Sequence, residues 1–318
     1  MLKKITAALL VLIIALSGLC SCGGTETKNE GLQIVCSIFP YYDWVRNLTE
    51  GAENVAVTLL LDSGTDFHSY QPAAKDIVKI SSADLFIYTD GSSDKWVSDV
   101  LKTSTNDSAA VLPMMTNLPE DSLFCVEAAG EEHHAEDVEH NHQKDEHIWL
   151  SVKNALRLCE IIKNVLCDID EKNAGIYKQN FINYCSELER LDNAYLQTIT
   201  EGSKDTVVFA DRFPFVYLIN DYSLSYHAAF SGCSADSNAS FETVTRLAGK
   251  IDELGLSCIL ITEASDGSVA KTIRDCTRDK NQEILTVDSM QSVSADKAEL
   301  SYIEIMEDNL EVIRKALF

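Results

Sequence analysis

The chain has 318 residues and a mass of 35.2 kDa, which is enough for two domains of ordinary size. Hydrophobic residues make up 46% and charged residues 24%, a globular composition that excludes disorder over the whole length. The 26 basic and 50 acidic residues give a net charge of −24 at pH 7. This charge argues against a nucleic-acid partner and against a polybasic contact with anionic lipid, and it suits a cationic ligand.

The first 21 residues have the organisation of a secretory signal: two lysines precede the uncharged apolar residues 5–16. This stretch is shorter than the roughly 20 residues that a membrane-spanning helix needs. The Leu-Cys-Ser-Cys run that ends at Cys22 resembles a bacterial lipoprotein signal, although a plain secretory signal is the alternative. We expect a signal peptide over residues 1–21, lipidation at Cys22 and a flexible tether over 22–31. The protein would then be exported, and either anchored to the outer face of the cell membrane or periplasmic.

Short apolar runs alternate with helical patterns in both halves of the remaining chain. Such alternation predicts the α/β class, with two lobes that each contain a mainly parallel four-stranded sheet flanked by helices. In the first half, we expect strands over residues 33–37, 55–61, 85–89 and 110–114, and helices over 41–49, 73–81 and 95–103. In the second half, we expect strands over 206–210, 224–230, 258–262 and 283–287, and helices over 213–221, 240–254, 269–279 and 297–317.

The strongest helical pattern lies between the two halves. Apolar residues recur at spacings of three and four from Tyr177 to Tyr195, and no proline interrupts them. The spacing predicts one long rigid helix over residues 173–200. This helix would join an N-terminal lobe of residues 32–172 to a C-terminal lobe of residues 201–318.

Polar side chains follow several predicted strands, where open parallel sheets bind their ligands. His68 follows the second strand, and His147 ends the long loop after the fourth. In the second half, Asp211, Glu263 and Asp288 each come directly after a strand. Two imidazoles from one lobe and carboxylates from the other would make a mixed nitrogen and oxygen site. Such a site suits a divalent ion of the zinc or manganese class.

Four segments of the chain resemble the zinc/manganese class of ABC-transporter solute-binding proteins: residues 37–44 (SIFPYYDW), 68–72 (HSYQP), 91–96 and 145–151 (DEHIWLS). The resemblance covers essentially the whole chain after the signal. It implies two lobes joined by a long helix, a metal ion held at their interface and delivery of that ion to an ABC transporter permease. By motif, His68 and His147 match the first two ligands of the family, and Asp288 matches the C-terminal acidic ligand.

The third ligand departs from the family pattern, which usually places His or Glu five residues before an aromatic residue. Counting back from Tyr217 leads to Arg212, which has no lone pair to offer a metal ion. Asp211, one residue earlier, is the preferred candidate, and Glu263 and His227 are the alternatives. Arg212 is instead a candidate partner for a ligand carboxylate.

Residues 131–147 hold five of the seven histidines and seven acidic residues, and they lack periodic apolar positions. We expect a mobile loop in which His133, His134, His140 and His142 collect metal ions weakly. The alternative is a solvated acidic insertion. Loops rich in histidine occur at this place in the zinc-handling branch of the family, so the resemblance favours Zn²⁺ over Mn²⁺ as the transported ligand.

Together with these residues, the resemblance implies a metal-binding lipoprotein of a metal uptake system, which we expect to be a monomer and not an enzyme. A secreted zinc-dependent hydrolase is the alternative from another class, but the chain has no H-E-x-x-H, no G-x-S-x-G and no P-loop motif. A surface adhesin that uses the same fold for cell adhesion is a further alternative, for which no sequence feature speaks specifically.

Overall fold

The computed structural model describes residues 31–318 except 63, 104–105, 107, 126–143, 231, 233–238 and 294–300. The chain divides into two units, Met1–Gly31 and Leu32–Phe318, and the description below concerns the second. The predicted signal peptide, tether and lipidation site at Cys22 therefore lie outside the described residues, as do the loop histidines His133, His134, His140 and His142. In the described ranges, no helix has the length and apolar character needed to cross a lipid bilayer.

The N-terminal lobe contains a sheet of four parallel strands in the order β2-β1-β3-β4. Ile34, Val35 and Cys36 of the central strand β1 are all buried, because both faces of the sheet are covered. The strands are β1 (Leu32–Cys36), β2 (Val55–Leu59), β3 (Leu85–Tyr88) and β4 (Ala110–Pro113), and the helices between them are α2 (Phe39–Thr49), α3 (Ala74–Ser82) and α4 (Val97–Leu101).

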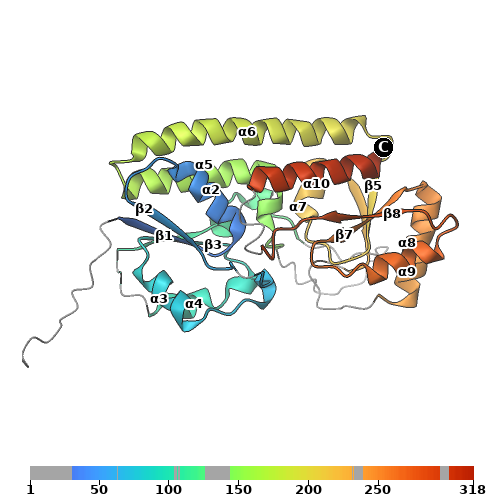
Figure 1. The fold of residues 1–318 in the computed structure, drawn as a ribbon, viewed down its shortest axis with the longest axis horizontal. Helices are drawn as coiled ribbons and strands as arrows, with labels where there is room; N and C mark the ends of the chain where they lie inside the picture. The colour runs from blue at the N-terminus through green and yellow to red at the C-terminus, as the bar shows by residue number, and fades with distance from the viewer. Residues whose placement is uncertain are drawn as a thin grey trace, which may run out of the picture. The chain divides into compact units, whose positions relative to one another are not determined.

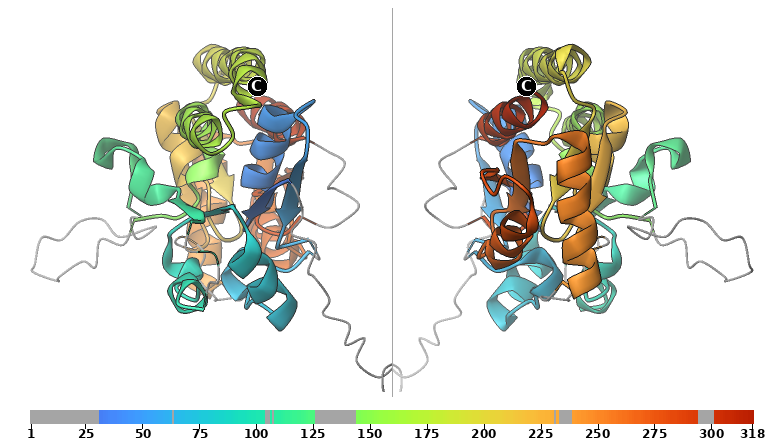
Figure 2. Two further views of the ribbon diagram at one scale, coloured as in Figure 1. Left: turned by 90° about the vertical axis from the view of Figure 1, so that its left-hand side faces the viewer. Right: turned by 90° about the vertical axis from the view of Figure 1, so that its right-hand side faces the viewer.

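The C-terminal lobe repeats this architecture, with four parallel strands in the order β6-β5-β7-β8. Alternate residues of its central strands enter different cores: Val208 and Ile259 pack with α8 and α9, whereas Val207 and Leu260 join the core that contains α10. Figure 2 shows α8 and α10 on different sides of this sheet. The elements are β5 (Thr206–Phe209), α7 (Val216–Asp221), β6 (Ser225–Ala228), α8 (Phe241–Leu254), β7 (Cys258–Thr262), α9 (Ser268–Cys276), β8 (Glu283–Val287) and α10 (Tyr302–Leu317). The predicted fold class is confirmed.

Helix α6 (Ala174–Glu201) is the predicted linking helix, and its 28 residues extend about 42 Å along both lobes (Figure 1). In the first half of α6, the Asn180 side chain donates a hydrogen bond to the carbonyl of Leu48 in α2 at 3.1 Å. At its second half, the Tyr195 hydroxyl donates to the carbonyl of Met306 in α10 at 2.7 Å. The same rigid element therefore contacts both lobes.

Helix α5 (Val152–Ile169) belongs to the N-terminal lobe and is not among the predicted helices. Ser151 caps it by accepting a hydrogen bond from the Asn154 amide at 2.9 Å. Its buried face repeats at spacings of three and four, as a helix lying against α6 requires; the buried residues include Val152, Ala155, Cys159, Ile162 and Leu166. The periodicity that would have identified α5 is thus present in the sequence.

Several predicted boundaries differ from those observed. Helix α7 begins at Val216 and not at 213, because Pro214 disfavours a helical conformation in the residue before it. Phe213 and Phe215 instead pack on Phe209, with ring centroids 5.1 Å away in each case. The helix predicted over 95–103 is shortened to α4 and preceded by a 3₁₀ turn over Ser92–Asp94. The described part of the last helix starts at Tyr302.

The segment around Trp149 joins the two lobes. The fully buried Trp149 indole donates to the carbonyl of Ser289 at 2.9 Å, and the Tyr302 hydroxyl donates to the carbonyl of Trp149 at 2.7 Å. The Tyr217 hydroxyl of α7 donates to the carbonyl of Asp145 at 2.7 Å. Buried hydrogen bonds of this kind are costly to break, so the chain just before and after His147 is fixed by contacts with the C-terminal lobe.

Candidate metal site

The two predicted histidine ligands share a local backbone motif. In each case an aspartate two residues earlier accepts a hydrogen bond from the histidine amide: Asp66 from His68 at 2.9 Å and Asp145 from His147 at 2.8 Å. A 3₁₀ turn accompanies both motifs, over Phe67–Ser69 and Ile148–Leu150. Aspartate favours such local bonds to the backbone, so the same D-x-H spacing fixes both turns.

The two imidazoles face each other, with their Nε2 atoms 3.1 Å apart. The Nδ1 atom of His147 lies 2.7 Å from Asp145 Oδ1, and the Nδ1 atom of His68 lies 2.9 Å from Ser93 Oγ and 3.2 Å from Glu146 Oε1. Carboxylates only accept hydrogen bonds, so each neutral imidazole carries its proton on Nδ1. Both Nε2 atoms then direct lone pairs toward the space between them.

Two lone pairs at this separation repel unless a cation lies between them. Two Zn–N bonds of about 2.05 Å at a tetrahedral angle place the nitrogens about 3.3 Å apart, close to the observed 3.1 Å. His147 is only 2% exposed, so solvent does little to screen the repulsion. The imidazole pair is therefore spaced and oriented for one shared ion.

Glu146 adds a buried negative charge beside this pair. Its carboxylate accepts hydrogen bonds from the Ser92 hydroxyl at 3.0 Å and from the Ser93 amide and hydroxyl at 2.9 and 2.7 Å. Burial raises the pKa of Glu146, but the contacts with His68 and Ser93 outweigh it and leave the pKa at about 2. The group is thus ionised at neutral pH, which favours a cation nearby.

Two acidic residues lie side by side in the C-terminal lobe. Glu263 and Asp288 follow the neighbouring strands β7 and β8, which end at the paired residues Thr262 and Val287. The Glu263 carboxylate accepts bonds from the Ser289 amide and hydroxyl at 2.8 and 2.7 Å. Burial first, and then the charge of Asp288, raises the pKa of Glu263. A divalent cation next to both groups would relieve this repulsion.

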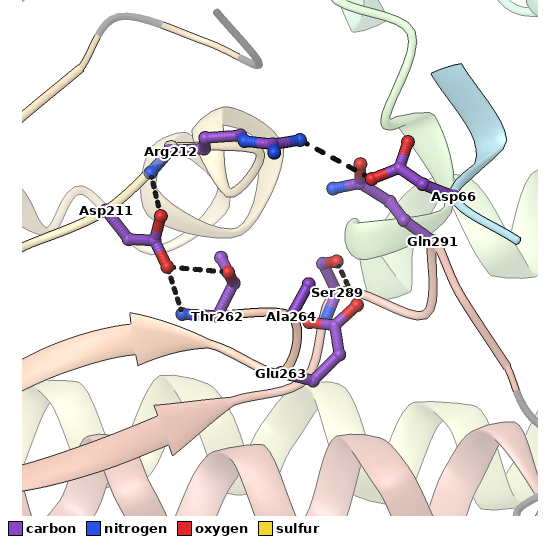
Figure 3. Close-up of a pocket in the computed structure, with 8 residues that line it drawn as sticks. All are labelled: Asp66, Asp211, Arg212, Thr262, Glu263, Ala264, Ser289 and Gln291. Atoms are coloured by element: carbon purple, nitrogen blue, oxygen red, sulfur yellow. Dashed lines mark hydrogen bonds and ion pairs between the residues drawn. The ribbon is translucent and has the colours of Figure 1, made fainter. Parts of the chain in front are cut away.

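Asp211 and Glu263 line a pocket between the lobes, and Asp66 closes it from the N-terminal lobe (Figure 3). Asp211 Oδ2 accepts bonds from the Thr262 amide and hydroxyl at 3.2 and 2.8 Å. The Arg212 guanidinium points across the pocket to Asp66, at 3.4 Å from its Oδ2 atom. Arg212 therefore pairs with an aspartate that was not among the predicted ligands.

The described part of the chain holds no group of three or more His, Cys, Asp or Glu side chains arranged to bind a metal ion. The structure brings His68 and His147 together, and it places the carboxylates of the C-terminal lobe in or beside the pocket. Asp66 connects the histidine pair to the pocket. Its Oδ1 atom accepts a hydrogen bond from the His68 amide, and its Oδ2 atom contacts the Arg212 guanidinium.

His227 is placed elsewhere, within strand β6, and it is not among the residues that line the pocket. Burial, followed by the charges of Lys250 and Arg246 in α8, lowers the pKa of His227. These cations oppose binding of a metal ion at His227, which lies outside the pocket that Asp211 and Glu263 line.

Four residues that hold the two imidazoles in place are not among the predicted site residues: Asp66, Ser93, Asp145 and Glu146. A signal for three of them was present, because each acid stands one or two residues before a selected histidine. Ser93 could not be found this way, since it approaches His68 only through the fold.

The chain is similar to known proteins both in sequence and in fold. The sequence model of the family "Zinc-uptake complex component A periplasmic" matches residues 34–316. The chain is 26% identical over 295 residues to the zinc-binding protein AdcA of Streptococcus pyogenes serotype M3, covering 89% of this chain and 55% of AdcA. It is 26% identical over 316 residues to the high-affinity zinc uptake system protein ZnuA of Bacillus subtilis (strain 168), covering 98% and 96%. The chain thus spans about half the length of AdcA and nearly all of ZnuA.

Two solved structures illustrate the likeness in fold. The Zn(II)-bound ZnuA-like domain of Streptococcus pneumoniae AdcA superposes with a TM-score of 0.71 at 24% identity, covering 90% of this chain and 99% of that domain. The laminin-binding protein Lmb of Streptococcus agalactiae, described as an adhesin with metal-transporting activity, gives a TM-score of 0.73 at 20% identity and covers 91% and 100%. At these identities the likeness is one of fold.

Proposed function

Because the chain belongs to the family of periplasmic zinc-uptake complex component A proteins, we propose that it is an exported solute-binding protein that captures one Zn²⁺ ion between its lobes. It would deliver this ion to the permease of an ABC transporter. The family is one of transport components and not of enzymes, and we propose no catalytic role for the chain. The observation that best supports metal capture is the facing pair of Nε2 atoms on His68 and His147, 3.1 Å apart.

We assign four residues to the ion in this proposal. His68 and His147 bind through Nε2, Asp288 supplies one carboxylate, and Asp211 supplies the other. Two neutral imidazoles and two carboxylates offset the charge of a divalent ion, and a set of two nitrogens and two oxygens suits zinc in tetrahedral geometry. Glu263 is the competitor of Asp211, because both line the pocket. Mn²⁺ is the alternative cargo, and it prefers oxygen-rich sites.

The remaining parts of the chain have supporting roles in this proposal. Residues 1–21 direct export, Cys22 carries a lipid that anchors the protein through the tether of residues 22–31, and the His-rich loop gathers zinc weakly. The lobes of residues 32–172 and 201–318 share one ion and are held by the helix of residues 173–200. The protein acts as a monomer outside the cytoplasm.

Metal analysis of protein purified without chelator, followed by competition titration with Zn²⁺ and Mn²⁺, tests the proposed cargo. One tightly bound zinc ion that Mn²⁺ displaces poorly is the expected result. Protein that carries no tight divalent ion would overturn the proposal.

Three substitutions decide between the candidates for the third ligand. Asp211→Asn keeps the side-chain volume and removes the charge, so it should weaken zinc binding strongly if Asp211 contacts the ion. Glu263→Gln and His227→Ala should then have mild effects. Wild-type affinity for Asp211→Asn, together with a severe loss for Glu263→Gln, would transfer the role to Glu263.

A further inference from the structure

We propose that Glu146 is a positioning residue for His68, holding the imidazole so that Nε2 faces the bound ion. This inference rests on the proposed function, because it concerns the same ion. Glu146 itself does not coordinate metal in this proposal. Its carboxylate lies on the Nδ1 side of the His68 ring, 3.2 Å from that atom, while Nε2 on the opposite side faces His147.

The carboxylate of Glu146 connects three segments that are remote in sequence. The residue is only 6% exposed. Its oxygens accept bonds from the 3₁₀ turn over Ser92–Asp94: from the Ser92 hydroxyl, and from the amide and hydroxyl of Ser93. The third segment is the turn that carries His68. A buried carboxylate with this many donors has one fixed orientation.

The backbone next to this carboxylate is shaped to receive it. A Cβ atom built on Gly91 would lie 2.2 Å from Glu146 Oε2 and 2.6 Å from Glu146 Cβ, well inside van der Waals contact. Any other residue at position 91 would therefore displace the Glu146 side chain. The close approach of Gly91 is what lets the carboxylate reach the Ser93 amide at 2.9 Å.

Ser93 completes the arrangement and fixes the proton of His68. Its hydroxyl donates to Glu146 Oε1 at 2.7 Å, so its oxygen is available to accept from His68 Nδ1 at 2.9 Å. Both neighbours of Nδ1 thus act as acceptors, and Nδ1 must donate. Histidine ligands of metals commonly have such a partner, and its loss typically weakens metal affinity 10–100-fold.

The two imidazoles are supported in different ways. His147 is oriented by Asp145 within its own turn, at 2.7 Å. His68 depends on a carboxylate from a distant segment, and that carboxylate belongs to the residue directly before His147. Glu146 therefore supports the imidazole of His68 and not that of its neighbour His147.

A double-mutant cycle separates this role from a purely structural one. Glu146→Gln in the full-length protein should weaken Zn²⁺ binding about 10–100-fold, measured by competition with a chromophoric chelator. The same change should have less than about a twofold further effect in the His68→Ala background, where there is no imidazole left to position. In the His147→Ala background its effect should persist. Asp43→Asn is the matched control: Asp43 is another buried carboxylate of the same lobe, and it contacts Tyr302 and not the imidazoles.

The absorption spectrum of the Co²⁺-substituted protein adds a readout of ligand geometry, which Glu146→Gln should change and Asp43→Asn should not. If Glu146→Gln unfolds the protein, Ser93→Ala serves as the second variant, with the same expected pattern and a smaller loss.

Wild-type affinity for the Glu146 variant, or an equal loss with and without His68, would overturn the inference while leaving the proposed function intact. Failure of the wild-type protein and the Asp43 control to bind zinc would instead overturn the proposed function.

Discussion

Replacing Asp94 by asparagine should make the stability of the folded protein less dependent on pH. Asp94 is 4% exposed and ends the 3₁₀ turn that supplies Ser92 and Ser93 to Glu146. Its Oδ2 atom accepts bonds from the amides of Thr89 and Asp90 at 2.8 and 3.2 Å. Burial, as the largest cause, raises the pKa of Asp94 from 3.8 to about 7, although these two backbone bonds lower it.

The sign of the effect follows from the raised pKa. Ionised Asp94 is less favourable in the folded protein than in the unfolded chain. The stability that protonated Asp94 contributes is complete below its unfolded pKa and is lost as the pH rises through about 7. Between the unfolded pKa of 3.8 and the folded pKa of about 7, the free energy of unfolding falls by about 1.4 kcal/mol per pH unit. Between about pH 5.5 and about pH 8, ionisation of Asp94 alone should therefore lower the free energy of unfolding by about 2 kcal/mol.

Urea unfolding of chelator-treated protein at these two pH values measures the difference. Asparagine can accept the same two backbone bonds through its carbonyl oxygen but does not titrate. Wild-type protein should lose about 2 kcal/mol more between pH 5.5 and pH 8 than Asp94→Asn does. Other titrating groups contribute to both proteins and cancel in this comparison. Identical pH dependence in the two proteins would refute the reasoning.

Three further outcomes are expected. Arg212→Met should raise zinc affinity severalfold, because it removes the cation that pairs with Asp66 at the pocket; unchanged or weaker binding in a competition titration would contradict this. Deleting residues 132–143 should leave one tight zinc ion and remove only weaker binding in calorimetry; loss of the tight ion would mean that the loop supplies a ligand. Tyr302→Phe should lower the free energy of unfolding by about 1 kcal/mol or more in urea titrations, because it removes the buried bond to the Trp149 carbonyl; unchanged stability would show that this bond contributes little.

Much of the fold could be predicted from hydrophobic patterns, because both sheets are parallel and buried. Strands of such sheets are short, nearly continuous apolar runs, and 258–262 and 283–287 were predicted with the observed bounds. The linking helix was predicted to within one residue at each end, because a long amphipathic stripe is the clearest sequence signal. Helix α7 begins at Val216, later than the apolar pattern predicts, because Pro214 disfavours a helical conformation in the residue before it.

The candidate site could be predicted only in part. His68 and His147 could be chosen because they stand in distinctive motifs, and the structure brings their Nε2 atoms together. The partners of the His68 imidazole depend on tertiary contacts: Ser93 meets His68 across 25 residues of sequence, and Glu146 contacts it from the segment that carries His147. The third ligand was ambiguous for a physical reason, since Asp211 and Glu263 follow different strands that end at the same pocket.

Zinc titration of the wild-type protein beside His68→Ala and His147→Ala tests metal capture by the imidazole pair most directly. Calorimetry with chelator competition should show one tightly bound Zn²⁺ ion in the wild-type protein. Each alanine variant should lose most of this affinity, because a single imidazole remains where two face each other at 3.1 Å. Retention of the wild-type stoichiometry and affinity in both variants would contradict a metal site at His68 and His147.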